Sequence, residues 1–249
     1  MQRAEELINP IPEWLSRTQL MVGADNLRCL HEAHVLVAGL GGVGSAAAEM
    51  LCRSGIGKMT IADSDVVQSS NINRQLVALH STIGKSKTDV MKQRLLDINP
   101  QIELAIVEKY LKDHTIIELL AEPFDYVVDA IDTLSPKVYF IYYALKNNQS
   151  LISSMGAGGK LNPALIRTAD FRDTSHCKLA YDLRKRLRRL GIESGFQAVY
   201  SIEQTPSSAI LETGFERNKK STIGTISYMP VLFGCWCASL VINAILRQS

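Results

Sequence analysis

Short apolar runs alternate with longer amphipathic stretches from residue 32 onward, which is typical of a parallel sheet covered by helices. In the clearest unit, residues 34–39 (HVLVAG) predict a buried strand, residues 45–54 a helix ending near Gly55, and residues 58–63 (KMTIAD) the next strand. The same rhythm predicts strands at residues 102–107, 126–130 and 151–154, and helices at residues 85–97 and 138–146. The sequence therefore predicts an α/β fold with a Rossmann-like, mostly parallel sheet and helices on both faces.

The pattern changes beyond residue 155. A turn at Asn162-Pro163 separates two short apolar runs, and a basic helix is predicted at residues 177–190, before a polar stretch at 201–220. Residues 222–246 carry no charged side chain and predict a buried strand followed by a buried helix, in preference to a membrane-spanning segment. We therefore expect the sheet to continue here as a mixed or antiparallel part.

No stretch of the sequence is rich enough in proline, glycine or serine to separate two domains. We expect a single domain over residues 1–249, with a nucleotide-binding part at about residues 30–155 and a substrate and dimer part at about residues 156–249.

Composition narrows the class of protein. With 46% hydrophobic and 21% charged residues among 249, the chain can bury a large core, which excludes intrinsic disorder. The net charge is only +2, so any nucleic-acid site must be local. Five cysteines without a CxxC pair, and a beginning (MQRAEELINPIPEW) unlike a secretory signal, predict reduced thiols and a cytoplasmic location.

A glycine motif, GLGGVG, stands between the first predicted strand and the first predicted helix. Glycines let the backbone approach phosphates, and the following helix offers free N–H groups at its positive end. Asp63 lies 19 residues beyond the last glycine, at the end of the next strand, where a carboxylate can bind ribose hydroxyls. The motif predicts a nucleotide site, whereas the simpler alternative is a tight turn alone. Its glycines are Gly39, Gly41, Gly42 and Gly44.

Charges downstream favour ATP over a dinucleotide. Asn71, Arg74 and Lys87 follow the second strand, and two cations suit a triphosphate. The strand at 126–130 ends in a DAID sequence, which places carboxylates at the ligand-binding edge of the sheet. Because Mg²⁺ prefers one or two carboxylates beside phosphate oxygens, we expect Asp132 to bind Mg²⁺, although a helix N-cap would suit this aspartate as well.

Six motifs in order support a resemblance to a known family. The chain is similar to the adenylating enzymes related to ubiquitin-activating enzyme (the ThiF/MoeB type). Within them RTQLMVGADNL near the start and GTISYMPVLFG at 224–234 most resemble the bacterial tRNA threonylcarbamoyladenosine dehydratases. The motifs are SRT at 16–18, GLGGVGS at 39–45, DSDVV at 63–67, SNINRQ at 70–75, GKSK at 84–87 and DAID at 129–132.

The resemblance implies a role for each site residue. Asp63 would hold the ribose of ATP, Arg74 and Lys87 its phosphates, and Asp132 the Mg²⁺, while Arg17 would reach the ATP of the neighbouring subunit in a homodimer. The implied substrate is a tRNA bearing threonylcarbamoyladenosine. Its carboxylate would attack the α-phosphate of ATP, and a nucleophile of the same modification would then close a ring with net loss of water.

Two alternatives stay open at this stage. One is adenylation of the C-terminal carboxylate of a ubiquitin-like sulfur-carrier protein, with Cys177 as a thiol nucleophile and a cysteine desulfurase or sulfur acceptor as partner. The paired CxxC sequences often found in such activators are absent from this chain, and cysteine is commonly a small buried residue. The other is a nicotinamide-dependent oxidoreductase, against which the two cations and the aspartates speak.

The predicted basic helix offers a surface for tRNA. Leu179, Leu183, Leu187 and Leu190 form an apolar stripe at helical spacing, and cations fill the other faces. Such a helix suits phosphate contacts, which position RNA without reading its sequence, although a merely solvated basic face is the simpler interpretation. The expected tRNA-binding cations are Arg184, Lys185, Arg188 and Arg189.

Overall fold

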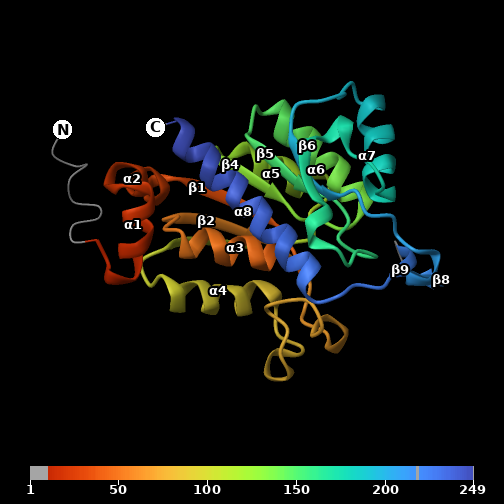
Figure 1. Ribbon diagram of the computed structural model, residues 1–249, viewed down its shortest axis with the longest axis horizontal. Helices are drawn as coiled ribbons and strands as arrows, with labels where there is room; N and C mark the ends of the chain where they lie inside the picture. The colour runs from red at the N-terminus through yellow and green to blue at the C-terminus, as the bar shows by residue number, and fades with distance from the viewer. Residues whose placement is uncertain (1–10, 217–218, 249) are drawn as a thin grey trace.

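The computed structural model describes residues 11–216 and 219–248 and contains a seven-stranded sheet (Figure 1). The strand order is β3-β2-β1-β4-β5-β7-β6, and neighbouring strands are parallel except β6, which is antiparallel to β7. The predicted mostly parallel sheet with an antiparallel part is confirmed. The strands are β1 (His34–Ala38), β2 (Lys58–Ala62), β3 (Glu103–Val107), β4 (Tyr126–Asp129), β5 (Leu151–Ser154), β6 (Ile166–Asp170) and β7 (Gln197–Ser201).

Helices cover both faces of this sheet (Figure 1), and each face has its own apolar core. Helices α2, α3, α4 and α8 pack on one face, and α5, α6 and α7 pack on the other. The α-helices are α1 (Ser16–Val22), α2 (Ala24–Glu32), α3 (Gly44–Arg53), α4 (Lys87–Ile98), α5 (Asp113–Ala121), α6 (Leu134–Lys146), α7 (Lys178–Arg189) and α8 (Tyr228–Gln248). Single-turn 3-10 helices are η1 (Glu13–Leu15), η2 (Ser69–Asn71), η3 (His80–Thr82), η4 (Pro163–Leu165), η5 (Phe171–Asp173) and η6 (Ser207–Ala209).

Helix α8 lies against α3 at very short range. A Cβ added to Gly234 of α8 would stand 2.4 Å from the carbonyl oxygen of Val43, so only glycine permits this approach. Phe233, Cys237 and Val241 of α8 have no exposed surface and join the core above β1 and β5. Helix α8 therefore packs directly on the first turn of α3.

By length and composition alone α8 is apolar enough to cross a membrane, and it is the one such helix in the part of the chain that the structure describes. Core helices of soluble proteins pass the same test. Helix α8 packs against α2, α3 and β5, so the predicted buried helix is confirmed for one of its faces, whereas Tyr228 and Trp236 are about 40% exposed on the other.

The structure corrects the prediction for the segment before α8. The predicted buried strand from residue 222 is wrong, because Ile223 is 41% exposed and ends a strand that pairs only with its neighbour. This two-stranded sheet, β8 (Ile210–Glu216) and β9 (Lys219–Ile223), stands apart from the main sheet. Sequence analysis also missed α1, α2, α5 and β7, and placed the start of α6 four residues late.

Candidate nucleotide site

The carboxyl ends of β1, β2 and β4 lie side by side at the place where the strand order of the sheet reverses. Strand β1 has β2 and β3 on one side and β4 and β5 on the other. Ligands of open α/β sheets bind in the crevice at such a switch point. The three segments that leave these strands are the glycine motif, the segment from Asp63 to Lys87, and the turn at residues 129–132.

Three glycines of the motif are required by packing. Gly39 has a φ of +89°, and a Cβ added there would lie 2.8 Å from the carbonyl oxygen of Ala130. A Cβ on Gly44 would lie 1.7 Å from the carbonyl oxygen of Gly39, and one on Gly42 would lie 2.7 Å from Cβ of Pro230 in α8. At Gly41 the nearest atom would be 3.8 Å away. The loop is thus tightly packed at Gly39, Gly42 and Gly44 and open at Gly41. We call this glycine loop the cradle, because its shape at the start of α3 suits a phosphate.

Asp63 connects the end of β2 to this loop. One carboxylate oxygen accepts a hydrogen bond from the N–H of Leu40 at 2.6 Å, and the other accepts from the N–H of Asp65 at 2.8 Å. Burial raises the pKa of the Asp63 carboxyl, while the Lys87 ammonium and the two backbone donors oppose that shift. Each carboxylate oxygen keeps a further lone pair for a ribose hydroxyl.

The two predicted phosphate-binding cations belong to the segment that follows β2. The Lys87 side chain is 6% exposed, and its Nζ lies 2.8 Å from the Asp65 carboxylate. Arg74 is half-buried and donates through Nη1 to the carbonyl of Ser70 and to Oδ1 of Asn73, both at 2.9 Å. Both cations are thus held in place by this segment's own groups: Arg74 lies just after η2, and Lys87 is the first residue of α4.

Asn71 and Gln75 bring polar groups close to the glycine loop. Asn71 is buried, and its Oδ1 accepts from the N–H of Gln68, which fixes the turn of η2. Gln75 is 9% exposed, and within the described residues its Oε1 is a buried oxygen without a hydrogen-bond partner. Its Nε2 is the atom nearest to a Cβ added at Gly41. The amide nitrogen of Gln75, a hydrogen-bond donor, therefore borders the open part of the cradle.

The two aspartates of the turn at residues 129–132 differ in burial. Asp129 has no exposed surface and pairs with the equally buried Lys137 at 2.7 Å. Asp132 is exposed, and therefore Asp132 is the aspartate of the two that a metal can approach. Sequence analysis missed Lys137, although a lone lysine directly before the apolar helical run VYFIYY at 138–143 was a signal.

Arg17 lies apart from these residues within one chain. It is exposed on α1, which follows Leu15. Leu15 packs beside Gly55, just beyond the last residue of α3, whereas the glycine loop lies at the first residue of that helix. The structure therefore does not bring Arg17 to the site of its own chain.

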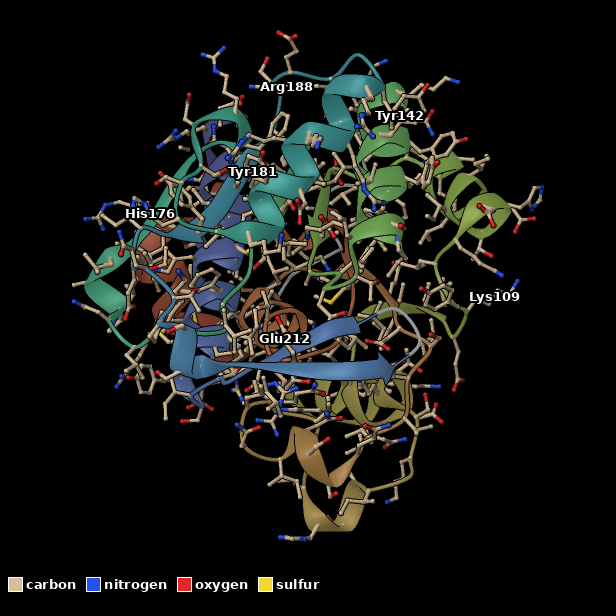
Figure 2. All side chains as sticks on the ribbon, turned by 90° about the vertical axis from the view of Figure 1, so that its right-hand side faces the viewer. Lys109, Tyr142, His176, Tyr181, Arg188 and Glu212 are labelled. Carbon is tan, nitrogen blue, oxygen red and sulfur yellow. The ribbon has the colours of Figure 1, made fainter. Side chains whose placement is uncertain are left out.

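Helix α7 carries the predicted tRNA-binding cations in two different environments. Arg184 is half-buried and donates to the carbonyl and hydroxyl of Thr174, so its guanidinium already has partners in the fold. Lys185, Arg188 and Arg189 are exposed, and Figure 2 shows Arg188 pointing outward from α7 on the same side of the molecule as the β8–β9 hairpin. The predicted leucine stripe is partly wrong, because Leu190 follows the helix and is 38% exposed.

The cysteines form no metal site. Within residues 11–216 and 219–248, no group of three His, Cys, Asp or Glu side chains could hold a metal ion. Burial in α8 raises the pKa of the Cys237 thiol to about 12. Cys177 is half-buried, with its Sγ 3.6 Å from a Cβ added at Gly156, in the segment that follows β5.

The fold and this edge of the sheet define an α/β nucleotide-binding enzyme with a glycine loop, a carboxylate at the end of β2 and two cations in the segment that follows. The chain belongs to the ThiF family, whose model matches residues 15–249, and within it to the tRNA threonylcarbamoyladenosine dehydratases.

Similar proteins support this placement. The chain is 42% identical to the tRNA threonylcarbamoyladenosine dehydratase of Bacillus subtilis over 76% of its own length and 74% of that protein. It is 35% identical to the enzyme of the same name from Haemophilus influenzae, over 90% of each chain. The crystal structure of the Escherichia coli tRNA N6-threonylcarbamoyladenosine dehydratase in complex with ATP is similar with a TM-score of 0.85 and 31% identity, over 93% of each chain.

Proposed function

We propose that this protein is an ATP-dependent tRNA threonylcarbamoyladenosine dehydratase, which adenylates the threonylcarbamoyl carboxylate and cyclises it on the tRNA. The similarity to enzymes of that name over up to 90% of the chain is the observation that carries the proposal. The architecture of the site agrees with it, because cradle, carboxylate and cations meet at one edge of the sheet.

The chain's residues would divide the chemistry as follows. The glycine loop and Asp63 orient ATP, and Arg74 and Lys87 stabilise the charge that develops on the phosphates. The substrate carboxylate attacks the α-phosphate, the bond to the β-phosphate breaks, and pyrophosphate leaves. A neighbouring nucleophile of the modified adenosine then attacks the acyl carbon, AMP leaves with one carboxylate oxygen, and a ring remains. Because this second attack is intramolecular, it needs no enzyme thiol.

The residues present fit ATP and Mg²⁺. The bare cradle at Gly41, bordered by the amide nitrogen of Gln75, is a feature that a bound phosphate would fill. Asp132 would hold Mg²⁺ together with phosphate oxygens and water, since the buried Asp129 is occupied by Lys137. When bound, Mg²⁺ supplies charge neutralisation at the phosphates.

A homodimer would complete the site with Arg17 of the neighbouring subunit. Support comes from α1, where Leu20 is 88% exposed and Met21 is 86% exposed beside this arginine, as expected for a surface that pairs with another. Residues 156–249 would supply the tRNA-binding side of the same single domain and, together with α1, the dimer surface. The five free thiols are consistent with a cytoplasmic location.

One assay tests the proposal directly. Purified protein is given Mg·ATP and bacterial tRNA bearing threonylcarbamoyladenosine, and ATP–pyrophosphate exchange and the mass of the tRNA nucleosides are measured. We expect exchange that depends on the tRNA, together with a nucleoside lighter by one water. Exchange with a sulfur-carrier protein and none with tRNA would refute the dehydratase assignment.

A first prediction concerns the exposed cations of α7. Replacing Lys185 and Arg188 together by alanine should weaken tRNA binding about 10-fold at low salt. The slope of log K against log salt should fall by about 1 to 2, because two phosphate contacts are lost. Filter binding at several salt concentrations measures both quantities, and Arg28→Ala is the control, because this exposed arginine lies in the middle of α2, a helix far from α7. An unchanged salt slope would remove this helix from the tRNA surface.

A second prediction separates the two kinds of adenylation. Sulfur-carrier activation with a thiol nucleophile, served by a desulfurase or sulfur-acceptor partner, would require Cys177. Cyclisation on tRNA would not, so Cys177→Ala should keep more than about half of wild-type turnover, because a half-buried thiol without a chemical role is replaced at little cost. Loss of product formation in a folded Cys177→Ala protein that retains ATP–pyrophosphate exchange would show that a thiol acts after adenylation, and would favour the sulfur-carrier alternative.

A further inference from the structure

A fully buried ion pair lies beneath the turn that carries Asp132. Nζ of Lys137 in α6 is 2.7 Å from Oδ2 of Asp129 at the end of β4, and both side chains are 0% exposed. The hydroxyl of Ser153 in β5 donates to the same Asp129 oxygen at 2.7 Å. One carboxylate thus connects two adjacent strands and the helix that follows the turn.

The same pair holds both backbone polar groups of Ile131. Its N–H donates to Oδ1 of Asp129 at 3.1 Å, and its carbonyl accepts from Nζ of Lys137 at 3.1 Å. The carbonyl of Ile131 and the N–H of Asp132 share one rigid peptide plane. The hydrogen bond from Lys137 therefore orients the peptide that leads directly into Asp132.

The opposite side of this turn rests on the nucleotide cradle. The carbonyl oxygen of Ala130 would lie 2.8 Å from a Cβ at Gly39, and its Cβ would lie 3.1 Å from a Cβ at Gly44. Ala130 thus touches the glycine loop, while Ile131 is held by the ion pair. The turn is fixed between the two, and Asp132 follows at its end.

Stability alone does not explain a buried lysine here. Desolvation of two charges commonly cancels their attraction, and apolar residues of similar size often stabilise a core equally well. The neighbours of Lys137 in α6 are apolar and buried, among them Val138, Phe140 and Ile141. A methionine would suit such surroundings, whereas a lysine adds a directed hydrogen bond to the Ile131 carbonyl.

We propose that Lys137 is a positioning residue for the reaction: paired with Asp129, it fixes the 129–132 turn so that Asp132 faces the phosphates bound by the glycine loop. This inference rests on the proposed role of Asp132 as the Mg²⁺ ligand. Residues that orient metal ligands from behind typically change metal affinity or activity 10- to 100-fold when they are replaced.

The test uses the double substitution Lys137→Met with Asp129→Asn. It removes both charges at nearly constant volume, and the asparagine oxygen can still accept from the N–H of Ile131. We expect a folded protein whose turnover number falls about 10- to 100-fold while its KM for tRNA is unchanged. Mn²⁺ binding in the presence of a non-hydrolysable ATP analogue, followed by electron paramagnetic resonance, should weaken at least about 10-fold.

Two companions make the result specific. Ile141→Val, one turn further along α6, should lower the free energy of unfolding by about 1 kcal/mol and leave Mn²⁺ affinity unchanged. Asp132→Asn should weaken Mn²⁺ binding as much as the double variant does. If the double variant does not fold, Ser153→Ala takes its place. It removes one donor to Asp129, and we then expect a Mn²⁺ affinity about 3-fold lower.

The outcomes are distinguishable. Weaker Mn²⁺ binding in both the double variant and Asp132→Asn supports the inference. Wild-type Mn²⁺ affinity in the double variant, or in Ser153→Ala when that is the protein tested, overturns it and leaves the Asp132 assignment standing. Wild-type affinity in Asp132→Asn overturns the inference together with the proposed magnesium site, whatever the other variant does.

Discussion

Replacing Asp132 by alanine is expected to lower the rate of pyrophosphate exchange about 1,000-fold, which corresponds to about 4 kcal/mol of transition-state stabilisation. The loss would be specific to chemistry. Asp132 is exposed at the edge of the sheet and belongs to neither apolar core, so the melting temperature should stay near that of the wild type.

The control for this prediction is Asp97→Ala. Asp97 is also exposed, but it lies near the C-terminal end of α4, whereas the candidate site lies at the N-terminal end of that helix. This control variant should leave turnover unchanged. Differential scanning fluorimetry beside the exchange assay separates catalysis from folding. A folded Asp132→Ala protein with wild-type exchange would remove this residue from the mechanism and would leave the turn without a metal ligand.

The second large effect is expected for Lys87→Met, with kcat/KM for ATP falling about 100- to 1,000-fold. The Lys87 ammonium lies 2.8 Å from Asp65 and opposes the rise in the pKa of Asp63 that burial causes. Without it, two carboxylates would face an anionic triphosphate with no cation from α4 between them. The fold should survive, because Asp65 is 67% exposed and water can solvate it once its partner is gone.

Titration of the exchange rate with ATP measures this prediction. Lys87→Arg should restore part of the activity, because it keeps the charge but changes the geometry. Lys92→Met, which removes a half-exposed cation from the same helix, should behave as wild type. A normal KM and kcat in Lys87→Met would show that Arg74 and the cradle bind the triphosphate without help from α4.

The inner strands β1, β2, β4 and β5 could be predicted from sequence because they are buried on both faces. Burial on both faces demands continuous apolar runs, so β1 and β2 were placed within one residue of their observed ends. The basic helix was found for a related reason, since α7 buries one stripe, including Leu183 and Leu187, and exposes the rest.

Other elements were not predicted because their sequences carry weak local signals. The β8–β9 hairpin pairs only with itself, so no apolar pattern marks it. Helix α5 is only nine residues long, and the segment before it, EKYLK at 108–112, contains no helix-capping Ser, Thr, Asp or Asn. Contacts between distant segments lie beyond any local pattern, and Pro230 against Gly42 is one example.

The candidate site also has features that the sequence predicts and features that only tertiary packing decides. The sequence by itself determined the glycine motif, the carboxylates at strand ends and the cations after β2, because backbone freedom, strand termination and charge are local properties. Tertiary structure alone decided that Asp129 is buried by Lys137 while Asp132 is exposed, that Arg184 binds Thr174, and that Arg17 lies far from its own chain's cradle. The physical reason is that burial and hydrogen bonding depend on which segments pack together, and packing joins residues far apart in the sequence.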